Sequence, residues 1–362
     1  MQTTPSLTLT LFLLLLPPLF SLTIGVTGSS GRLGSLVVSS LARSLPRNST
    51  VRALCRDEGI CRDKLKDLVD KGDEGDVDVV VQEIDLTSRD GVAEGMKGLD
   101  AIVTCHGASN SKRKYFKWAV YPRFWGRDSE VYFEGNVGGR DLGHPYYAHY
   151  VSTKNILSGC SVNGVKTIVS VTGLTCGLDP KSIVSVIFNA VMGFGPMWHR
   201  ASEDLIRSSP DVDNYLIVRP GGMDETPRDK TVTNVEIDLS GTLPPPGFVS
   251  RHDVAELMSI AAVGGGIGGG SNRATAAVRA TGIVRGRDMG NLNDGKGSVI
   301  EAANFAISKL STSGGGKDAN ATGRKTDYGA FKVVHGAFVV GVGSVFGAVA
   351  WKILGGLFKV LF

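Results

Sequence analysis

Hydrophobic and polar residues alternate along the chain in blocks of two lengths. From residue 22 to about residue 310, apolar runs of β-strand length are followed by amphipathic stretches of α-helix length. This rhythm is typical of a parallel sheet with helices on both faces, so it predicts a doubly wound α/β fold. The predicted strands cover residues 22–27, 50–54, 78–84, 100–105, 165–171, 214–219 and 277–284, and the predicted helices lie near residues 33–45, 60–71, 89–97, 148–163, 197–209, 251–263 and 297–310.

Two long insertions interrupt this rhythm. Residues 108–147 are rich in aromatic residues and glycine, and residues 220–250 contain the sequence "LPPPG". Both follow the carboxyl ends of predicted strands, where open α/β sheets bind their ligands. They are interpreted either as a substrate lid or as surface insertions without function. A third irregular stretch, "GGGIGGGSN" at 264–272, is predicted to be a flexible loop because no helix follows it.

The two ends of the chain are apolar. Residues 1–21 contain the run "LTLTLFLLLL" and are interpreted as a signal-like segment or a hydrophobic extension. A polar linker at 312–327 separates the α/β domain, residues 22–311, from a C-terminal segment at 328–362. Within that segment, residues 333–351 hold a single ionisable side chain and would form a helix of about 28 Å. They predict a membrane-type helix, or alternatively a helix lying on the membrane surface.

Charge and cysteine content narrow the range of partners. The net charge is +4, and the densest basic cluster, near 112–117, is interleaved with aromatic residues. A nucleic-acid partner is not expected, since such a cluster equally suits a loop beside a small anionic ligand. The five cysteines show no metal-ligand spacing, so no metal site and no full disulfide framework is predicted.

A glycine-rich loop follows the first predicted strand. In "VTGSSGRLG", Gly28 would allow a tight turn, Gly31 a close approach of the backbone to a pyrophosphate, and Gly34 close packing of helix on strand. The start of the next helix offers free N–H groups and a positive dipole end to phosphates. The loop, with Ser30, Arg32 and Leu33, therefore predicts a nicotinamide dinucleotide site.

The end of the second predicted strand bears on the choice of dinucleotide. There the sequence "VRALCRD" places Arg56 before Asp57, and Arg32 of the glycine loop can add a second cation. A carboxylate at this position binds the ribose hydroxyls of NAD, whereas a guanidinium pairs with the 2′-phosphate of NADP. The sequence favours NADP(H) over NAD(H), with Asp57 left as the alternative.

Several stretches together resemble a known family. The sequences "VTGSSGRLG", "VRALCRD", "DLTSRDGVAEGMKGLDAIVTCHGAS", "NGVKTIVSVTGL" and "VSRHDVAELM" are similar, in order and spacing, to atypical short-chain dehydrogenase/reductases, in particular to the NmrA-like NAD(P)H-binding group that includes plant plastid members. The resemblance implies a Rossmann core. It also implies further cofactor contacts: Asp85 and Leu86 near the adenine, Cys105, His106 and Gly107 along the cofactor, and Arg219 and Pro220 toward the nicotinamide.

The usual catalytic pair of this superfamily is missing at its expected place. Tyr150 and Lys154 have the Tyr-x-x-x-Lys spacing, but they lie before the fifth strand instead of after it. On the expected helix, aligning Arg200 with the lysine leaves Pro196 where the proton-donating tyrosine should be. The remaining candidate catalytic residues are Ser170, Thr172 and His199.

Two functions follow from these features. The favoured one is an NADPH-dependent oxidoreductase that acts on an apolar carbonyl or alkene substrate, and the alternative is a non-catalytic NAD(P)H-binding scaffold or redox sensor at a membrane. The missing tyrosine leaves enzymatic activity open. The expected location is membrane-associated, in an organelle such as a plastid or in the endoplasmic reticulum.

Overall fold

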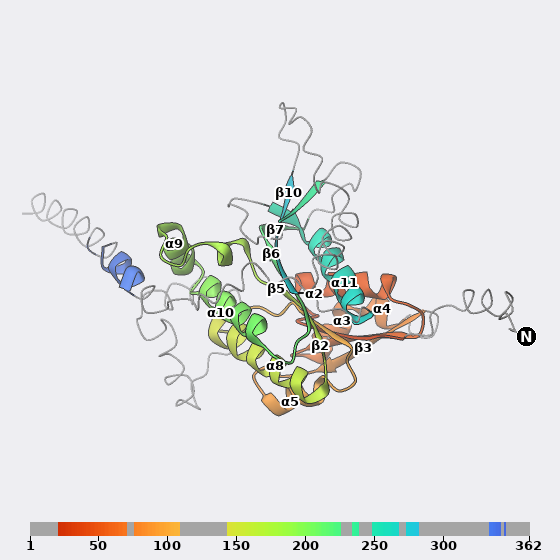
Figure 1. The fold of residues 1–362 in the computed structure, drawn as a ribbon. Helices are drawn as coiled ribbons and strands as arrows, with labels where there is room; N and C mark the ends of the chain where they lie inside the picture. Colours follow the sequence, from red (N-terminus) through yellow and green to blue (C-terminus); the bar gives the residue numbers. More distant parts are fainter. Residues whose placement is uncertain are drawn as a thin grey trace, which may run out of the picture.

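The computed structural model describes residues 21–70, 76–108, 143–225, 234–238, 248–267, 273–281, 333–341 and 344. Within these residues an 8-stranded sheet runs through the molecule in the order β3-β2-β1-β4-β5-β6-β10-β8 (Figure 1). Neighbouring strands are parallel except for β8, which is antiparallel to β10. The strands are β1 (Thr23–Thr27), β2 (Ser49–Cys55), β3 (Val77–Glu83), β4 (Ala101–Thr104), β5 (Thr167–Val171), β6 (Asn214–Pro220), β8 (Asn234–Asp238) and β10 (Arg273–Thr281).

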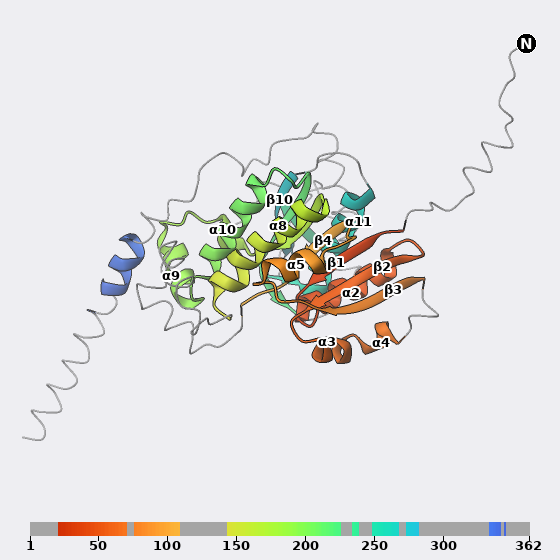
Figure 2. The ribbon, with the colours of Figure 1, turned by 90° about the horizontal axis from the view of Figure 1, so that it is seen from below.

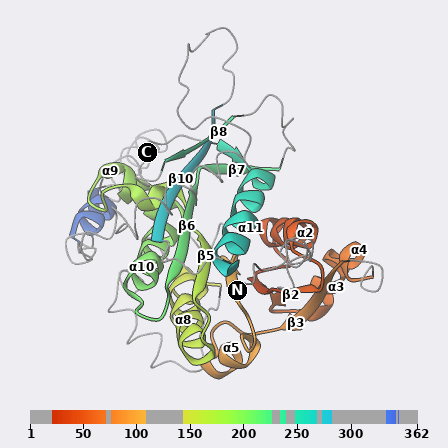
Figure 3. The same ribbon diagram turned by 45° about the vertical axis from the view of Figure 1, so that its right-hand side comes forward.

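Helices cover both faces of the sheet, which confirms the predicted Rossmann-like fold. Figure 3 shows α2 and α11 on one side of the sheet and α8 and α10 on the other. The first layer holds α2 (Arg32–Ser44), α3 (Glu58–Lys64), α4 (Lys66–Val69) and α11 (Arg251–Ile267), and the second holds α5 (Arg89–Gly95), α8 (Ser152–Asn163) and α10 (Gly195–Ser208). The strand order reverses between β1 and β4, which is where doubly wound folds bind nucleotides.

The core explains why these segments form these elements. Ile24 and Val26 of β1 are fully buried, and Val37 and Leu41 of α2 pack in the same hydrophobic cluster. On the other face, residues of β4 and β5 pack against α5 and α8 in a second cluster. Because β1 is covered on both sides, its sequence is a nearly continuous apolar run, as expected for a central parallel strand.

Several elements differ from the predictions. The helix α11 continues to Ile267, so it includes the first residues of the stretch predicted as a flexible loop. A helix that was not predicted, α9 (Ile183–Val191), stands between a short 3₁₀ turn, η3 (Leu174–Gly177), and α10. The insertion 220–250 contributes β7 (Gly222–Asp224) and β9 (Phe248–Ser250), which pair with each other, as well as β8. Most of the insertion 108–147 lies outside the described residues, as does the basic cluster near 112–117.

The end of the insertion 108–147 is described, and it forms a π-helix, η2 (Tyr146–Val151), that leads directly into α8. Tyr146 and Tyr150 pack against Trp198 of α10, with ring centroids 4.9 and 5.7 Å apart. Single turns of π-helix are rare, and those that do occur are frequently found at functional sites. The turn η2 is therefore a candidate part of the functional site.

The predicted membrane-type helix is corrected by the structure. No helix of the described part of the chain is long and apolar enough to cross a bilayer. Helical residues 333–341, blue in Figure 2, instead lie beside the domain near α9. The buried His335 ring lies 4.7 Å from the ring of Phe194, and Val334 and Phe338 pack against the same aromatic cluster. The membrane-associated location predicted from this segment is therefore wrong. The predicted extension at 1–20 and linker at 312–327 lie outside the described residues.

Candidate functional site

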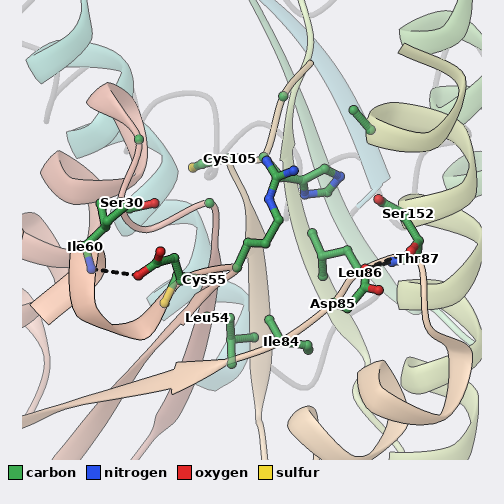
Figure 4. Close-up of a pocket in the computed structure, with 17 residues that line it drawn as sticks. Ser30, Leu54, Cys55, Ile60, Ile84, Asp85, Leu86, Thr87, Cys105 and Ser152 are labelled. Atoms are coloured by element: carbon green, nitrogen blue, oxygen red, sulfur yellow. Dashed lines mark hydrogen bonds between the residues drawn. The ribbon is translucent and has the colours of Figure 1, made fainter. Parts of the chain in front are cut away.

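A cavity of about 540 Å³ opens at the carboxyl ends of the first four strands. Figure 4 shows Ser30, Cys55 and Ile60 on one side of it and Asp85, Thr87 and Ser152 on the other. The structure brings most of the predicted cofactor residues to this cavity. The lining consists of Gly28, Ser30, Gly31, Leu54, Cys55, Arg56, Asp57, Ile60, Ile84, Asp85, Leu86, Thr87, Cys105, His106, Gly107, Ala148 and Ser152.

The glycine loop is shaped by two positions that no side chain could occupy. Gly28 has a φ of 68°, and a Cβ there would lie 2.8 Å from the His106 backbone. A Cβ on Gly34 would lie 2.2 Å from the carbonyl oxygen of Gly28. These contacts hold the start of α2 against the end of β1. Gly31 caps α2 without a side-chain hydrogen bond, and no acidic residue lies in the first turn. The first amides of α2 are thus left for an anion such as a pyrophosphate, and the site fits a dinucleotide.

The turn after β2 carries the residues that were predicted to distinguish NADP from NAD. Arg56 and Asp57 both line the cavity. Asp57 is the N-cap of α3, and its Oδ1 accepts a hydrogen bond of 2.9 Å from the amide of Ile60. The carboxylate is therefore already engaged with a helix end, while Arg56 projects from the same turn without any such role.

The ends of β3 and β4 complete the cavity wall. The carboxylate of Asp85 accepts hydrogen bonds from the amide and the hydroxyl of Thr87, at 2.8 and 2.7 Å, which fixes the turn that carries Leu86. Cys105 follows β4, and burial raises the pKa of its thiol to about 12. This thiol is neutral at physiological pH and contributes a small apolar surface to the wall.

Some predicted cofactor residues do not reach the cavity. The guanidinium of Arg32 forms an exposed ion pair of 3.2 Å with Glu225 of the insertion 220–250, and Arg32 is not among the residues that line the cavity. Leu33 and Gly34 belong to the packed start of α2 and do not line the cavity. Pro220 ends β6 and is buried. Arg219 is also buried, and its guanidinium faces α10.

Arg219 belongs to a buried charge cluster behind the sheet edge. Glu203 of α10, fully buried, accepts hydrogen bonds from Arg219 Nε at 3.0 Å and from Arg207 Nη2 at 2.9 Å. Burial alone would raise the pKa of Glu203, but the two guanidinium groups lower it to about 2. The carboxylate is therefore ionised throughout the physiological range. This pairing ties α10 to the end of β6.

The two predicted hydroxyl groups are engaged as well. Ser170 Oγ accepts a hydrogen bond of 2.8 Å from Thr104 Oγ1, which joins β5 to β4. Thr172 Oγ1 donates to Glu203 at 2.7 Å and so belongs to the buried charge cluster. Both side chains hold strand ends in place in this structure.

Three histidines gather where the cavity meets η2 and α10. His106 lines the cavity, and its Nδ1 lies 2.8 Å from Thr27 Oγ1. The rings of His149, on η2, and His199, on α10, have centroids 3.6 Å apart. Burial lowers the pKa of His106 and of His199 to about 4 and also lowers that of His149. All three rings are neutral at pH 7.

His149 was not among the predicted site residues. It lies just after the insertion 108–147, one residue before Tyr150 of the Tyr-x-x-x-Lys spacing. The only sequence signal was the cluster of His144, Tyr147 and His149 around the end of the insertion, and that signal was too general to assign a role. Tyr150 is buried between aromatic rings, whereas Lys154 is exposed, so the two do not form a site together.

The helix that would carry the usual tyrosine and lysine uses those positions structurally. Pro196 lies in the first turn of α10. Arg200 donates hydrogen bonds to the carbonyl oxygens of Cys176 and Leu178, at 3.3 and 2.7 Å. In the described part of the chain, no group of three or more His, Cys, Asp or Glu side chains is arranged to hold a metal ion.

The comparison with protein families agrees with the cavity and its glycine loop. Residues 28–262, more than half of the chain, match the model of an NAD(P)H-binding family. The chain belongs to this NAD(P)H-binding family. The matched region begins at Gly28 of the glycine loop and ends in α11, so it includes every strand end that lines the cavity. The predicted resemblance is thus confirmed.

Two plant relatives of this NAD(P)H-binding protein are chloroplast proteins. The chain is 29% identical to Protein TIC 62, chloroplastic, of Arabidopsis thaliana over 240 residues, which is 65% of the chain and 32% of the relative. It is 28% identical to the protein of the same name from Pisum sativum over 246 residues, 66% of the chain and 39% of the relative. The chain thus spans about a third of the length of the first relative and about two fifths of the second. Their location fits the plastid prediction.

Solved structures show the same fold. A Bacillus halodurans protein assigned as an NAD-dependent epimerase/dehydratase superposes with a TM-score of 0.52 at 15% identity, over 79% of this chain and 100% of that protein. At this identity the likeness concerns the fold alone.

Proposed function

We propose that this protein is an NADPH-dependent reductase of an apolar carbonyl or alkene. The observation that carries the proposal is the arrangement of the cavity: it begins at Arg56 after β2, passes the glycine loop, and ends at His106 beside the His149–His199 ring stack. A dinucleotide bound along the glycine loop would have its adenosine near Arg56 and its nicotinamide toward the imidazoles. Bound NADPH supplies the hydride; the chain's own residues orient it and deliver a proton.

The turn after β2 supports NADP(H) as the cofactor. Asp57 already accepts a hydrogen bond from the amide of Ile60 through Oδ1. Its carboxylate is therefore poorly placed to accept hydrogen bonds from both ribose hydroxyls of NAD. Arg56 lines the same part of the cavity and can pair with a 2′-phosphate. The proposed discrimination therefore rests on Arg56 alone, since Arg32 is engaged with Glu225.

The surroundings of the imidazoles support an apolar substrate. The elements that carry His149 and His199 also carry an aromatic cluster, which includes Tyr146, Tyr150 and Trp198. Among the predicted catalytic residues, His199 is the proposed proton source, and Ser170 and Thr172 are proposed to hold the strand ends that receive the substrate.

A substrate screen tests this function. The full chain is mixed with NADPH and, in turn, with menadione, an aromatic aldehyde and an α,β-unsaturated ketone, and the loss of NADPH absorbance is followed. We expect at least one compound to be reduced faster than in the absence of protein. Tight NADPH binding without reduction of any compound would overturn the reductase and leave a nucleotide-binding scaffold as the better description.

A further inference from the structure

The His149–His199 ring stack lies outside every role that the fold requires. The rings come from η2 and α10, two elements that are far apart in sequence and adjacent in space. In the described part of the chain neither ring makes a hydrogen bond, although His149 is only 5% exposed. The ring nitrogens of the pair are therefore not committed to a hydrogen bond within the described residues and can serve a ligand.

The position of the two stacked rings indicates which ligand could contact them. A Cβ placed on Gly107, which lines the cavity, would lie 4.0 Å from Cε1 of His149. The next cavity residue along the chain from η2 is Ser152, and Ala148 precedes His149. Through His149, the stack therefore borders the end of the cavity at β4, which is the end proposed for the nicotinamide and the substrate.

Neighbouring charged groups affect the protonation of His199 and of His149 differently. Glu203 lies four residues after His199 on α10 and favours the protonated form of that ring, although Arg219 and Arg207 neutralise much of its field. His199 in turn disfavours a proton on His149 and on His106. His144, at the start of η2, opposes protonation of His149 as well. Of the two stacked rings, His199 is therefore favoured for the first proton, and its charge disfavours a second proton on His149 and His106.

We infer that His199 and His149 form an acid pair that takes up a single proton and delivers it from His199 to the substrate oxygen, with His149 as the positioning residue. This inference rests on the proposed reductase function. For a carbonyl substrate, its carbon gains a hydride with both electrons, the π electrons of the C=O bond move to the oxygen, and that oxygen takes the proton of His199. His199 becomes neutral and is reprotonated from solvent. The pair would replace the tyrosine that is missing from α10.

Proton binding by the cluster can be measured without turnover. The full chain is labelled with ¹⁵N-histidine, and its six histidines are titrated by NMR in the wild type and in His199→Phe. Phenylalanine keeps an aromatic ring in the stack and removes both nitrogens. We expect the pKa of His149 and of His106 to rise in the variant, because the competing charge is gone. Unchanged values for both rings would overturn the single-proton pair.

The catalytic role is tested by pH profiles of the compound that the substrate screen identifies. In the wild type, kcat/KM is expected to rise about tenfold per pH unit as the pH falls from about 8 to about 5. His199→Phe is expected to lose this slope and about 10²- to 10⁴-fold in kcat/KM. His149→Phe is expected to keep the slope with a lower kcat, because the acid is present but poorly placed. The matched control is His252→Gln, an exposed histidine of α11, which is expected to leave the profile unchanged.

The outcomes separate this inference from the function on which it rests. Turnover with an identical pH profile in the wild type and both variants would overturn the acid pair and leave the reductase standing. No turnover with any compound would overturn the reductase and with it the delivery of a proton to substrate. The NMR titration would then decide whether the cluster still binds one shared proton.

Discussion

The two ends of the cavity are built in different ways. The proposed adenosine end consists mainly of backbone features, namely two glycines of the loop, the uncapped start of α2 and a short turn at Asp57, to which Arg56 adds one side chain. Near the proposed nicotinamide end, the distinctive features are pairs of side chains from separate elements, such as Glu203 with Arg219 and His149 with His199. The first end follows the general pattern of dinucleotide folds. Variants at one end can therefore test cofactor binding, and variants at the other can test chemistry.

The largest effect is expected from Glu203→Gln at the nicotinamide end. The variant removes the buried negative charge that pairs with Arg219 and Arg207, which should lower the free energy of unfolding by about 3–5 kcal/mol. Urea unfolding measures this loss. Glu94→Gln breaks an exposed pair with Lys97 and should cost less than about 1 kcal/mol. Equal losses in the two variants would contradict the structural role given to the buried cluster.

A second variant addresses the adenosine end. Gly28→Ala forces a side chain onto a positive φ and against the His106 backbone, and should cost roughly 1–3 kcal/mol and weaken NADPH binding at least about tenfold. Gly98→Ala is the matched control, since Gly98 has a φ of 70° with no atom within 4 Å of a Cβ. It should show the cost of the backbone conformation alone and leave NADPH affinity unchanged. Weakened binding in both variants would show that the loop geometry is not specific.

The lowered pKa values in the imidazole cluster predict that the folded protein loses stability in mild acid. The pKa values of His106, His149 and His199 are lowered in the folded protein, so the unfolded chain binds protons that the folded chain does not. Stability should therefore fall as the pH drops below about 6.5 toward 4, by about 1–3 kcal/mol at pH 5.5. Glu203, with its pKa near 2, contributes to acid unfolding only at lower pH.

Urea unfolding at pH 7.5 and 5.5 measures this effect. His149→Phe removes one of the shifted groups and should reduce the difference in stability between the two pH values. His252→Gln alters an exposed histidine and should leave that difference as it is in the wild type. A difference that is the same in the wild type and in His149→Phe would show that the cluster is not protonated on unfolding in this range.

The smallest effect is expected from Lys154→Met. Lys154 is exposed on α8, and its apparent partner Tyr150 is buried among aromatic rings. The variant should retain kcat/KM within about twofold, whereas removing a lysine that supports proton transfer would cost roughly 10²-fold or more. A large loss of kcat/KM in the NADPH assay would instead support a catalytic role for Lys154.

The contrast between the two ends also explains what the sequence could predict. Strand rhythm and glycine spacing are local, so the parallel sheet and the loop from Gly28 to Gly34 could be predicted. Arg219 was expected to face the cofactor, but its guanidinium turns to Glu203, sixteen residues earlier in the chain. Arg32 was expected to meet a phosphate, but it pairs with Glu225 from a distant insertion. No local pattern indicates such partners, because they depend on how separate elements pack.

The membrane prediction was wrong for a related reason. An apolar run indicates only that its side chains avoid water, and both a bilayer and a protein surface satisfy that requirement. In the structure, the described residues of this run place His335, Val334 and Phe338 against the aromatic cluster that includes Phe194. The choice between the two environments required the position of α10, which the run itself does not encode.

The central claim, that the cavity binds NADPH with Arg56 as its selector, is tested most directly by titrating the full chain with NADPH and NADH and following nicotinamide fluorescence. Arg56→Asp is compared with Arg47→Asp, which alters an exposed arginine paired with Asp76. We predict that only Arg56→Asp weakens NADPH binding, by about 10- to 100-fold, while NADH binding is retained. Equal affinity for both nucleotides that Arg56→Asp does not change, or no binding of either, would contradict the account.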